Sequence, residues 1–281
     1  MPKIICICTL FLFLFIQPVF AAEPQSQRTV LTLELLKERI NSPMVNQGRL
    51  TVELRDMEIN LQPENQEFSD IFYKLLQDEL QKSGTKPVGL DLSDSIIEGD
   101  FVSSNLGLRT PLYAQAIAPI FTEAEQKQLE GLREVCLQSL AYSVPNSKDC
   151  RSLLGKDLTT SAQISVSRGS LIFQHTRFKG NVEFNNTFFL QPVEAKGAIF
   201  NEAVNLTQSR FSRRVTFANA NFRRQVDFDG SVFFDEANFK KTQFKKNAEL
   251  KNTTFEDTAD FSNAIFQELA YFSRARWEGT S

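Results

Sequence analysis

The chain has 281 residues, which is enough for one or two domains. Its net charge of −3 is close to neutral, which argues against a dedicated nucleic-acid binder, because such proteins carry a strongly basic surface. It contains one histidine, His175, which excludes any site that needs two imidazole side chains. Phenylalanine is the unusual count, with 26 residues against one tryptophan and four tyrosines.

The first segment has the composition of an export signal. An apolar run covers residues 4–20, and Val19 and Ala21 stand at the −3 and −1 positions of a cleavage site. The run is short for a membrane span and contains a glutamine and a proline. We predict a signal peptide over residues 1–21, with an uncleaved anchor as the alternative. The mature chain is then expected in the periplasm, a thylakoid lumen or the medium, without stable membrane insertion.

Export changes the expectation for the cysteines. Cleavage removes Cys6 and Cys8 and leaves Cys136 and Cys150. Two thiols in an oxidising compartment are most simply explained as a disulfide. Two buried thiols are the alternative, and a metal site lacks further cysteine or histidine ligands.

Residues 22–106 predict strands interrupted by helices. In the N-terminal segment 22–48, residues 32–40 have the spacing of a short helix. Residues 49–106 alternate apolar and polar side chains around Leu50–Leu54 and Leu90–Ile97, and these segments predict the first coils of a repeat structure. Between them, residues 67–82 carry apolar side chains at helical spacing, at Phe68, Ile71, Phe72, Leu75, Leu76 and Leu80.

Residues 107–161 are predicted to be a helical insertion. Thr122 and Glu125 form the capping-box pattern that begins a helix. An apolar stripe follows at Leu129, Leu132, Val135, Cys136 and Leu140. The insertion is interpreted as a structural cap or side module, with docking of a partner as the alternative.

Residues 162–281 contain a regular repeat. From Phe173 onward a large apolar residue, usually phenylalanine, recurs in steps that alternate between five and six, and Ala195 is the one exception. Small or β-branched residues stand two positions before nearly every large one. A spacing of two points both side chains to the same face of an extended segment, so each longer step must turn a corner.

The blocks from Ala220 to Arg224 and from Ala259 to Asn263 show the unit: a small residue, any residue, phenylalanine and two polar residues. They resemble the pentapeptide-repeat family, and the alternating spacing with the export signal looks like that of exported cyanobacterial-type members. The resemblance implies a mainly β fold, a right-handed quadrilateral β-helix, here with helical insertions in the N-terminal half. The alternating six makes the expected coil 22 residues long rather than 20. Because the interior is filled by its own side chains, we expect no lumen and no cofactor.

The most distinctive feature of the expected surface is a group of basic residues. Residues 171–281 carry 15 basic and 13 acidic residues, whereas residues 22–170 carry 15 basic and 21 acidic residues. Four dibasic pairs form a candidate docking strip for an anionic partner, with an ordinary solvated surface as the alternative. The strip consists of Arg213, Arg214, Arg223, Arg224, Lys240, Lys241, Lys245 and Lys246.

The last coil is the second candidate surface. Phe272 and Trp277 fall in it with no predicted helix to cover them, so this end either frays or pairs with a second copy. The resemblance to the family, whose members often dimerise through such an end, favours a homodimer. Outward-pointing residues are predicted to add an apolar patch at Phe188, Leu190, Val232 and Phe234.

Nothing in the sequence predicts catalysis. His175 stands alone, and the outward carboxylates of Asp227, Asp229, Asp235 and Glu236 are grouped only by sequence proximity. No phosphate-binding glycine loop, nucleophile elbow or metal-ligand spacing is present. We interpret the protein as an exported, non-catalytic interaction or structural scaffold with an unknown protein partner. The alternatives are a topoisomerase-shielding DNA mimic, which needs an acidic rod in the cytoplasm, and a polysaccharide-acting β-helix enzyme.

Overall fold

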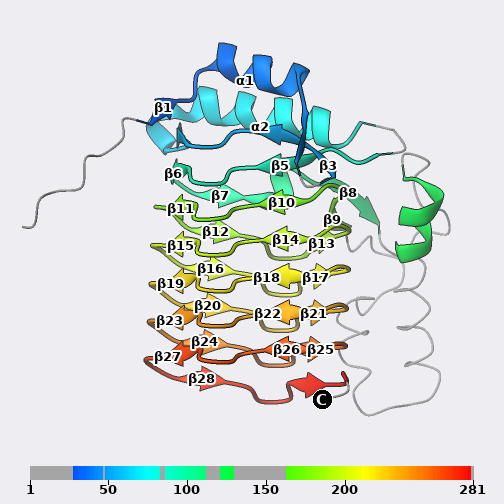
Figure 1. Cartoon of the computed structure of the whole chain (residues 1–281), viewed down its shortest axis with the longest axis vertical. Helices are drawn as coiled ribbons and strands as arrows, with labels where there is room; N and C mark the ends of the chain where they lie inside the picture. The colour runs from blue at the N-terminus through cyan, green and yellow to red at the C-terminus, as the bar shows by residue number, and fades with distance from the viewer. Residues whose placement is uncertain (1–27, 47, 83–85, 112–120, 130–162, 280–281) are drawn as a thin grey trace, which may run out of the picture.

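The structure, a computed structural model, describes residues 28–46, 48–82, 86–111, 121–129 and 163–279. The described chain winds into a solenoid, with its N-terminal end covered by helices and its coils stacked toward the C-terminal end (Figure 1). The expected fold class is confirmed: the C-terminal part is a β-solenoid of about five turns, and a few helices lie in the N-terminal half.

Four sheets run along the solenoid, and strands one coil apart are neighbours in each sheet. Sheet A contains β1 (Thr29–Val30), β4 (Met57–Asn60), β6 (Ile96–Glu98), β11 (Arg177–Phe178), β15 (Ile199–Phe200), β19 (Asn221–Phe222), β23 (Gln243–Phe244) and β27 (Ile265–Phe266). Sheet C contains β7 (Phe101–Val102), β12 (Val182–Glu183), β16 (Val204–Asn205), β20 (Val226–Asp227), β24 (Ala248–Glu249) and β28 (Ala270–Tyr271).

The other two sheets complete each coil. Sheet D contains β8 (Leu108–Pro111), β9 (Gln163–Ser167), β13 (Thr187–Phe189), β17 (Arg210–Phe211), β21 (Val232–Phe233), β25 (Thr254–Phe255) and β29 (Arg276–Trp277). Sheet B contains β2 (Met44–Asn46), β3 (Arg49–Glu53), β5 (Gly89–Asp91), β10 (Leu171–Ile172), β14 (Val193–Glu194), β18 (Val215–Thr216), β22 (Ala237–Asn238) and β26 (Ala259–Asp260). From β11 onward the chain visits the sheets in the order A, C, D, B, so A lies opposite D and C lies opposite B.

The register confirms the 22-residue coil. In sheet A, Phe178 pairs with Phe200, which pairs with Phe222, and the pairing continues through Phe244 to Phe266. The rings of Phe200 and Phe222 stack with centroids 4.7 Å apart and planes 5° from parallel. Both rings are fully buried, so the interior of the solenoid is packed with its own side chains.

The alternating steps correspond to two kinds of corner. The step of five follows sheets B and C, where a turn places one residue in the left-handed region, such as Asn219 with φ 58°. The next residue points inward, and at several of these positions a serine or threonine hydroxyl donates to a carbonyl of the preceding coil, as Ser231 does to Leu206 at 2.5 Å. The step of six follows sheets A and D, where three-residue connectors absorb the additional residue.

Two helices cover the N-terminal end of the solenoid. The helices expected near residues 32–40 and 67–82 are observed as α1 (Leu33–Asn41) and α2 (Gln66–Leu80), the latter preceded by the short 3₁₀ helix η1 (Pro63–Asn65). Buried side chains of α1 and α2 join the main apolar core, among them Leu36, Phe72 and Leu76. The N-terminal edge of the solenoid core is therefore shielded from water.

The predicted helical insertion needs one correction. Residues 108–111 form strand β8, which pairs antiparallel with β9, because the chain continues sheet D there after the 3₁₀ helix η2 (Ser103–Asn105). The predicted capping box is confirmed: Thr122 N–H donates to Oε2 of Glu125 at 2.7 Å, and residues 123–129 are helical. Residues 112–120 and 130–161 of the predicted insertion lie outside the described residues.

The predicted outward apolar patch is also wrong in part. Phe188 and Leu190 are buried in a second apolar cluster, and Phe234 packs against its edge. These side chains point away from the solenoid interior, but the segment around residues 121–129 packs against the outer surface of sheet D. Sequence spacing indicates the direction of a side chain and does not show what covers it. The other buried members of the cluster are Phe121, Leu129, Ile164 and Val166.

A buried arginine joins three segments that are far apart in the chain. Arg168, which is 0% exposed, donates from Nε to Oε1 of Glu125 at 2.9 Å and from Nη2 to Oε2 at 3.0 Å. Its Nη1 donates to the carbonyl oxygen of Lys82 at 2.7 Å, just beyond the end of α2. Arg168 thus connects the end of α2, the helix at residues 123–129 and the solenoid.

Candidate interaction surfaces

The structure divides the predicted basic strip among three corners. One group, Arg223, Arg224, Lys245 and Lys246, lies in the three-residue connectors from sheet A to sheet C of adjacent coils, as expected from the spacing of 22. Arg213 and Arg214 lie in a connector from sheet D to sheet B. Lys240 and Lys241 lie in a turn from sheet B to sheet A. The eight residues therefore do not form one strip.

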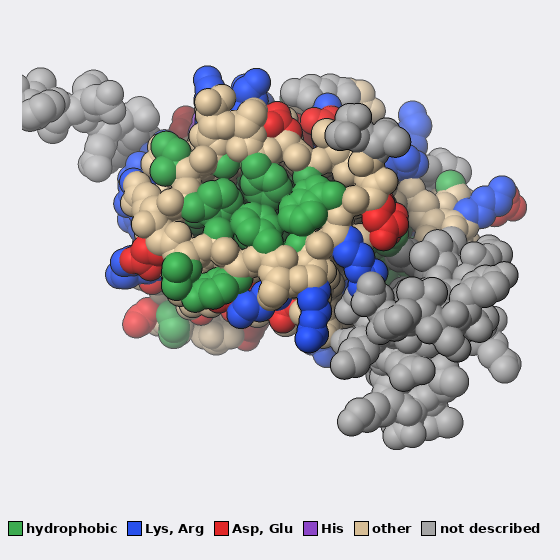
Figure 2. Space-filling model, turned by 90° about the horizontal axis from the view of Figure 1, so that it is seen from below, with side chains coloured by type: hydrophobic (Ala, Val, Ile, Leu, Met, Phe, Trp, Pro, Cys, Tyr) green, Lys and Arg blue, Asp and Glu red, His purple; other side chains and the backbone are tan. Residues whose placement is uncertain are grey.

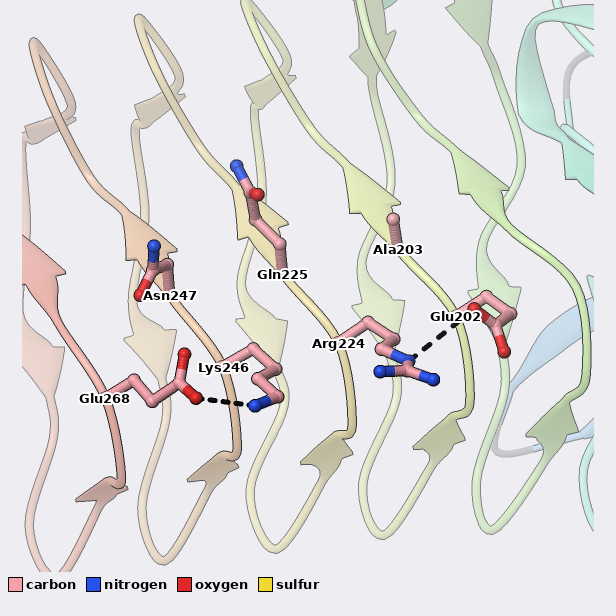
Figure 3. A pocket seen from close by; sticks show the side chains of 7 residues that line it. All are labelled: Glu202, Ala203, Arg224, Gln225, Lys246, Asn247 and Glu268. Carbon is pink, nitrogen blue, oxygen red and sulfur yellow. Dashed lines mark hydrogen bonds and ion pairs between the residues drawn. The ribbon is translucent and has the colours of Figure 1, made fainter.

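The connectors from sheet A to sheet C define a surface that we call the basic corner: residues 201–203, 223–225, 245–247 and 267–269. Arg224 Nε lies 3.8 Å from Glu202 Oε2, and Lys246 Nζ lies 2.5 Å from Glu268 Oε1. The two cations therefore lean in opposite directions along the rod, as Figure 3 shows. A groove of about 380 Å³ runs along this corner, lined by Glu202, Ala203, Arg224, Gln225, Lys246, Asn247 and Glu268.

The backbone holds the rungs of this corner at a fixed spacing. Arg223 N–H donates to the carbonyl of Phe200, and Lys245 N–H donates to that of Phe222, each at 2.9 Å. Adjacent rungs are thus separated by about 4.8 Å, the spacing of paired strands. The sequence interpretation missed Glu202 and Glu268, although each is offset by one 22-residue coil from a predicted cation.

The connectors from sheet D to sheet B define a second surface, the acidic corner: residues 212–214, 234–236, 256–258 and 278. Burial raises the pKa of Glu256, and the neighbouring Glu278 carboxylate in the next coil raises it further, while the Arg276 guanidinium opposes the shift. Negative charge is concentrated in the last three rungs of this corner, below Arg213 and Arg214. These rungs carry Asp235, Glu236, Glu256, Asp257 and Glu278.

The candidate carboxylates are not assembled into one site. Asp227 and Asp229 lie in β20 and in the turn that follows it, while Asp235 and Glu236 lie in the acidic corner. Burial raises the pKa of Asp227, with a further contribution from the Asp229 and Glu249 carboxylates. The structure therefore does not bring these four residues together as the paired carboxylates that hydrolysis of a polysaccharide would need.

The single histidine and the metal-ligating side chains form no cluster either. His175 is exposed, and its Nδ1 lies 3.4 Å from Oδ1 of Asp94. The described residues contain no group of three or more histidine, cysteine, aspartate or glutamate side chains suited to a metal ion.

The C-terminal end exposes apolar side chains. Figure 2 shows them gathered at the centre of this end, with backbone and polar groups around them. Trp277 is 51% exposed and Leu269 is 60% exposed, while Phe261, Phe266 and Phe272 are partly buried. The expected surface at Phe272 and Trp277 thus belongs to a larger set of exposed or partly buried apolar side chains in the last coil, and we call these five residues the end patch.

Two predictions lie outside the described residues: the signal peptide over residues 1–21 and the disulfide between Cys136 and Cys150. Within the residues that the structure describes, no helix has the length and apolar character needed to cross a bilayer.

A comparison with known protein families gives a match to the repeat region of the chain. The family model described as pentapeptide repeats (9 copies) matches residues 173–221, 195–243, 206–254 and 239–281. The comparisons with curated proteins and with solved structures gave no match. The matched ranges cover the coils in which the phenylalanine ladders, the 22-residue register and the two kinds of corner are observed, and the C-terminal region of the chain, residues 173–281, belongs to the pentapeptide-repeat family.

Proposed function

We propose that this protein is an exported, non-catalytic scaffold that binds protein partners, and that its end patch binds a second copy of the chain. The family of residues 173–281 suggests a repeat protein of non-enzymatic, interaction type. The observation that carries the proposal is the difference between the two ends of the solenoid. Helices α1 and α2 cover one end, whereas the last coil presents the end patch and the edges of strands β26 to β29, beside which no further described strand lies.

A second copy suits this end for two physical reasons. Removing the exposed apolar side chains around Trp277 from water is energetically favourable. The strand edges of one copy can also pair with those of another across a two-fold axis, which satisfies both sets of backbone groups. Both contacts form together when two last coils meet.

The mature chain is expected to sediment and scatter light as a dimer, and Trp277→Lys is expected to make it monomeric. The substitution places a charge at the centre of the contact, where it would have to be desolvated. Leu269→Lys provides a second test, because this exposed connector residue can be replaced without disturbing the ring of Phe255 on which Trp277 stacks. Size-exclusion chromatography with light scattering measures both.

Val45→Lys is the matched control, because Val45 is an exposed apolar residue of β2, outside the end patch. It should leave the dimer intact. A wild-type chain that is monomeric at every concentration, or a dimer that survives both end-patch substitutions, would refute self-association through this end.

Export is tested separately. When the full chain is expressed in its own cells, the protein outside the cytoplasm is expected to begin at Ala22 or at Glu23, because cleavage follows the small residues at the end of the apolar run. N-terminal sequencing of the fractionated protein measures this. Recovery of the protein from the cytoplasmic fraction alone, with residues 1–21 intact, would contradict export.

A further inference from the structure

Two opposite corners of the rod carry opposite charge in three successive coils. The basic-corner connectors 201–203, 223–225 and 245–247 read Asn-Glu-Ala, Arg-Arg-Gln and Lys-Lys-Asn. The acidic-corner connectors of the same coils, 212–214, 234–236 and 256–258, read Ser-Arg-Arg, Phe-Asp-Glu and Glu-Asp-Thr. In each coil the two connectors therefore have opposite signs, and both corners change sign after the first of the three coils.

This complementarity is not used inside the molecule. Because each coil visits sheets A, C, D and B in turn, the connector from A to C lies diagonally across the rod from the connector from D to B. Stacked phenylalanine ladders fill the space between them. The two corners consequently face in opposite directions, away from each other.

Most of the corner charges are available to a partner. Arg224 and Lys246 pair with acids of their own corner through exposed side chains, and such pairs exchange readily with other partners. The other corner cations and most of the corner acids are exposed or partly exposed. Within the described part of the chain, no ion pair involves Arg213, Arg214, Arg223, Lys245, Asp235, Glu236 or Asp257.

We infer that the rod binds further copies of itself side by side, parallel and level, with the basic corner of one copy against the acidic corner of the next. In this alignment Arg223 and Arg224 meet Asp235 and Glu236, and the coils on either side also meet with opposite signs. The coil after these three brings Glu268 level with Glu278, but Lys246 already neutralises Glu268.

The pattern of signs also selects the register. A shift by one coil in one direction brings Arg223 and Arg224 against Arg213 and Arg214. A shift in the other direction brings Glu202 against the carboxylates of residues 235 and 236 and keeps two contacts of opposite sign, one fewer than the level alignment. Both shifts juxtapose like charges, which penalises wrong alignments and favours the level arrangement.

The contact joins two different surfaces, so each copy can bind one neighbour on either side and the row stays open. Exposed ion pairs are individually weak and strongly screened by salt, so the association should be weak and dependent on ionic strength. It does not depend on the end patch, and a Trp277→Lys chain should still form it.

The test is sedimentation velocity of the mature chain, with and without Trp277→Lys. At about 0.01 M salt, where the Debye length is about 30 Å, the sedimentation coefficient is expected to rise with protein concentration. At about 1 M salt, where the Debye length is about 3 Å, the rise should disappear. The double variant Arg223→Glu/Arg224→Glu should abolish the rise, whereas Lys240→Glu/Lys241→Glu should leave it, since that pair makes the same charge change away from both corners.

A complementary pair of variants makes the test decisive. One variant reverses the basic corner, so that both corners are negative in the second and third of the three coils, and the other reverses the acidic corner, so that both corners are positive in those two coils. In the Trp277→Lys background, which lacks the end-patch dimer, neither should associate alone, because like charges would meet in two of the three coils. An equimolar mixture should associate, because each contact then joins a negative corner of one variant to a positive corner of the other. The substitutions are Arg223→Glu, Arg224→Glu, Lys245→Glu and Lys246→Glu in the first variant, and Asp235→Lys, Glu236→Lys, Glu256→Lys and Asp257→Lys in the second.

Circular dichroism checks that both reversed variants are folded. Three results would overturn the inference: absence of association of the Trp277→Lys chain at low salt, failure of the folded mixture to associate, and equal loss of association in the Lys240→Glu/Lys241→Glu control. None of these results bears on the end patch, whose dimer is measured at the salt concentration that removes the lateral contact.

Discussion

Replacing Phe222 by alanine is expected to lower the free energy of unfolding by about 3–5 kcal/mol. The Phe222 ring is 0% exposed and stacks on Phe200 at 4.7 Å and on Phe244 at 5.3 Å. Its removal loses the transfer free energy of a buried ring and leaves a cavity between two rungs that backbone hydrogen bonds hold apart. Urea denaturation of the mature chain, followed by circular dichroism, measures the loss.

Phe266→Ala is the matched control in the same ladder. Phe266 is partly exposed at the end patch, and its ring stacks on that of Phe244 at 4.5 Å, with no further coil described beyond it. The cost of Phe266→Ala should therefore be clearly smaller than that of Phe222→Ala. Equal costs at the two positions would show that burial within the ladder does not set the stability of the coils.

Replacing Arg168 by methionine is expected to destabilise the protein by about 3–5 kcal/mol, the cost of breaking a buried ion pair from one side. The substitution leaves the Glu125 carboxylate buried without its cation and leaves the Lys82 carbonyl without its donor. The same denaturation experiment measures the effect. Arg224→Met is the exposed comparison, and its 3.8 Å pair with Glu202 should contribute less than about 1 kcal/mol.

A second substitution distinguishes the buried charge from lost packing. Glu125→Gln in the Arg168→Met chain removes the unpaired charge and keeps a side chain that can complete the capping box with Thr122. Part of the lost stability should therefore return. If the double variant is no more stable than Arg168→Met alone, the arginine acts through packing and not through its charge.

The interior of the solenoid follows directly from the sequence. Phe178, Phe200 and Phe222 are neighbours in space because they are one coil apart in the chain, so a periodic sequence predicts a periodic core. The same periodicity separates Arg213 from Arg223, which are not one coil apart. The division of the basic residues among corners was therefore already present in the sequence, and grouping them by proximity along the chain obscured it.

Contacts outside the repeat required the tertiary structure. Lys82, Glu125 and Arg168 are far apart in the chain and share no period, so no local pattern predicts that one buried arginine joins them. Phe188 has the spacing of an outward residue, and it is buried because a distant segment that contains Phe121 packs over sheet D.

The sequence by itself thus determined the repeat spacing and the inward ladders, since these depend on hydrogen bonding and packing that repeat from one coil to the next, and its resemblance to the pentapeptide-repeat family implied the four-sided coil. The tertiary structure decided which outward side chains are covered, which charges face each other and which end of the described solenoid the helices cover. Those features depend on contacts between segments that the repeat does not relate, and their energies are set by burial and distance in the folded chain.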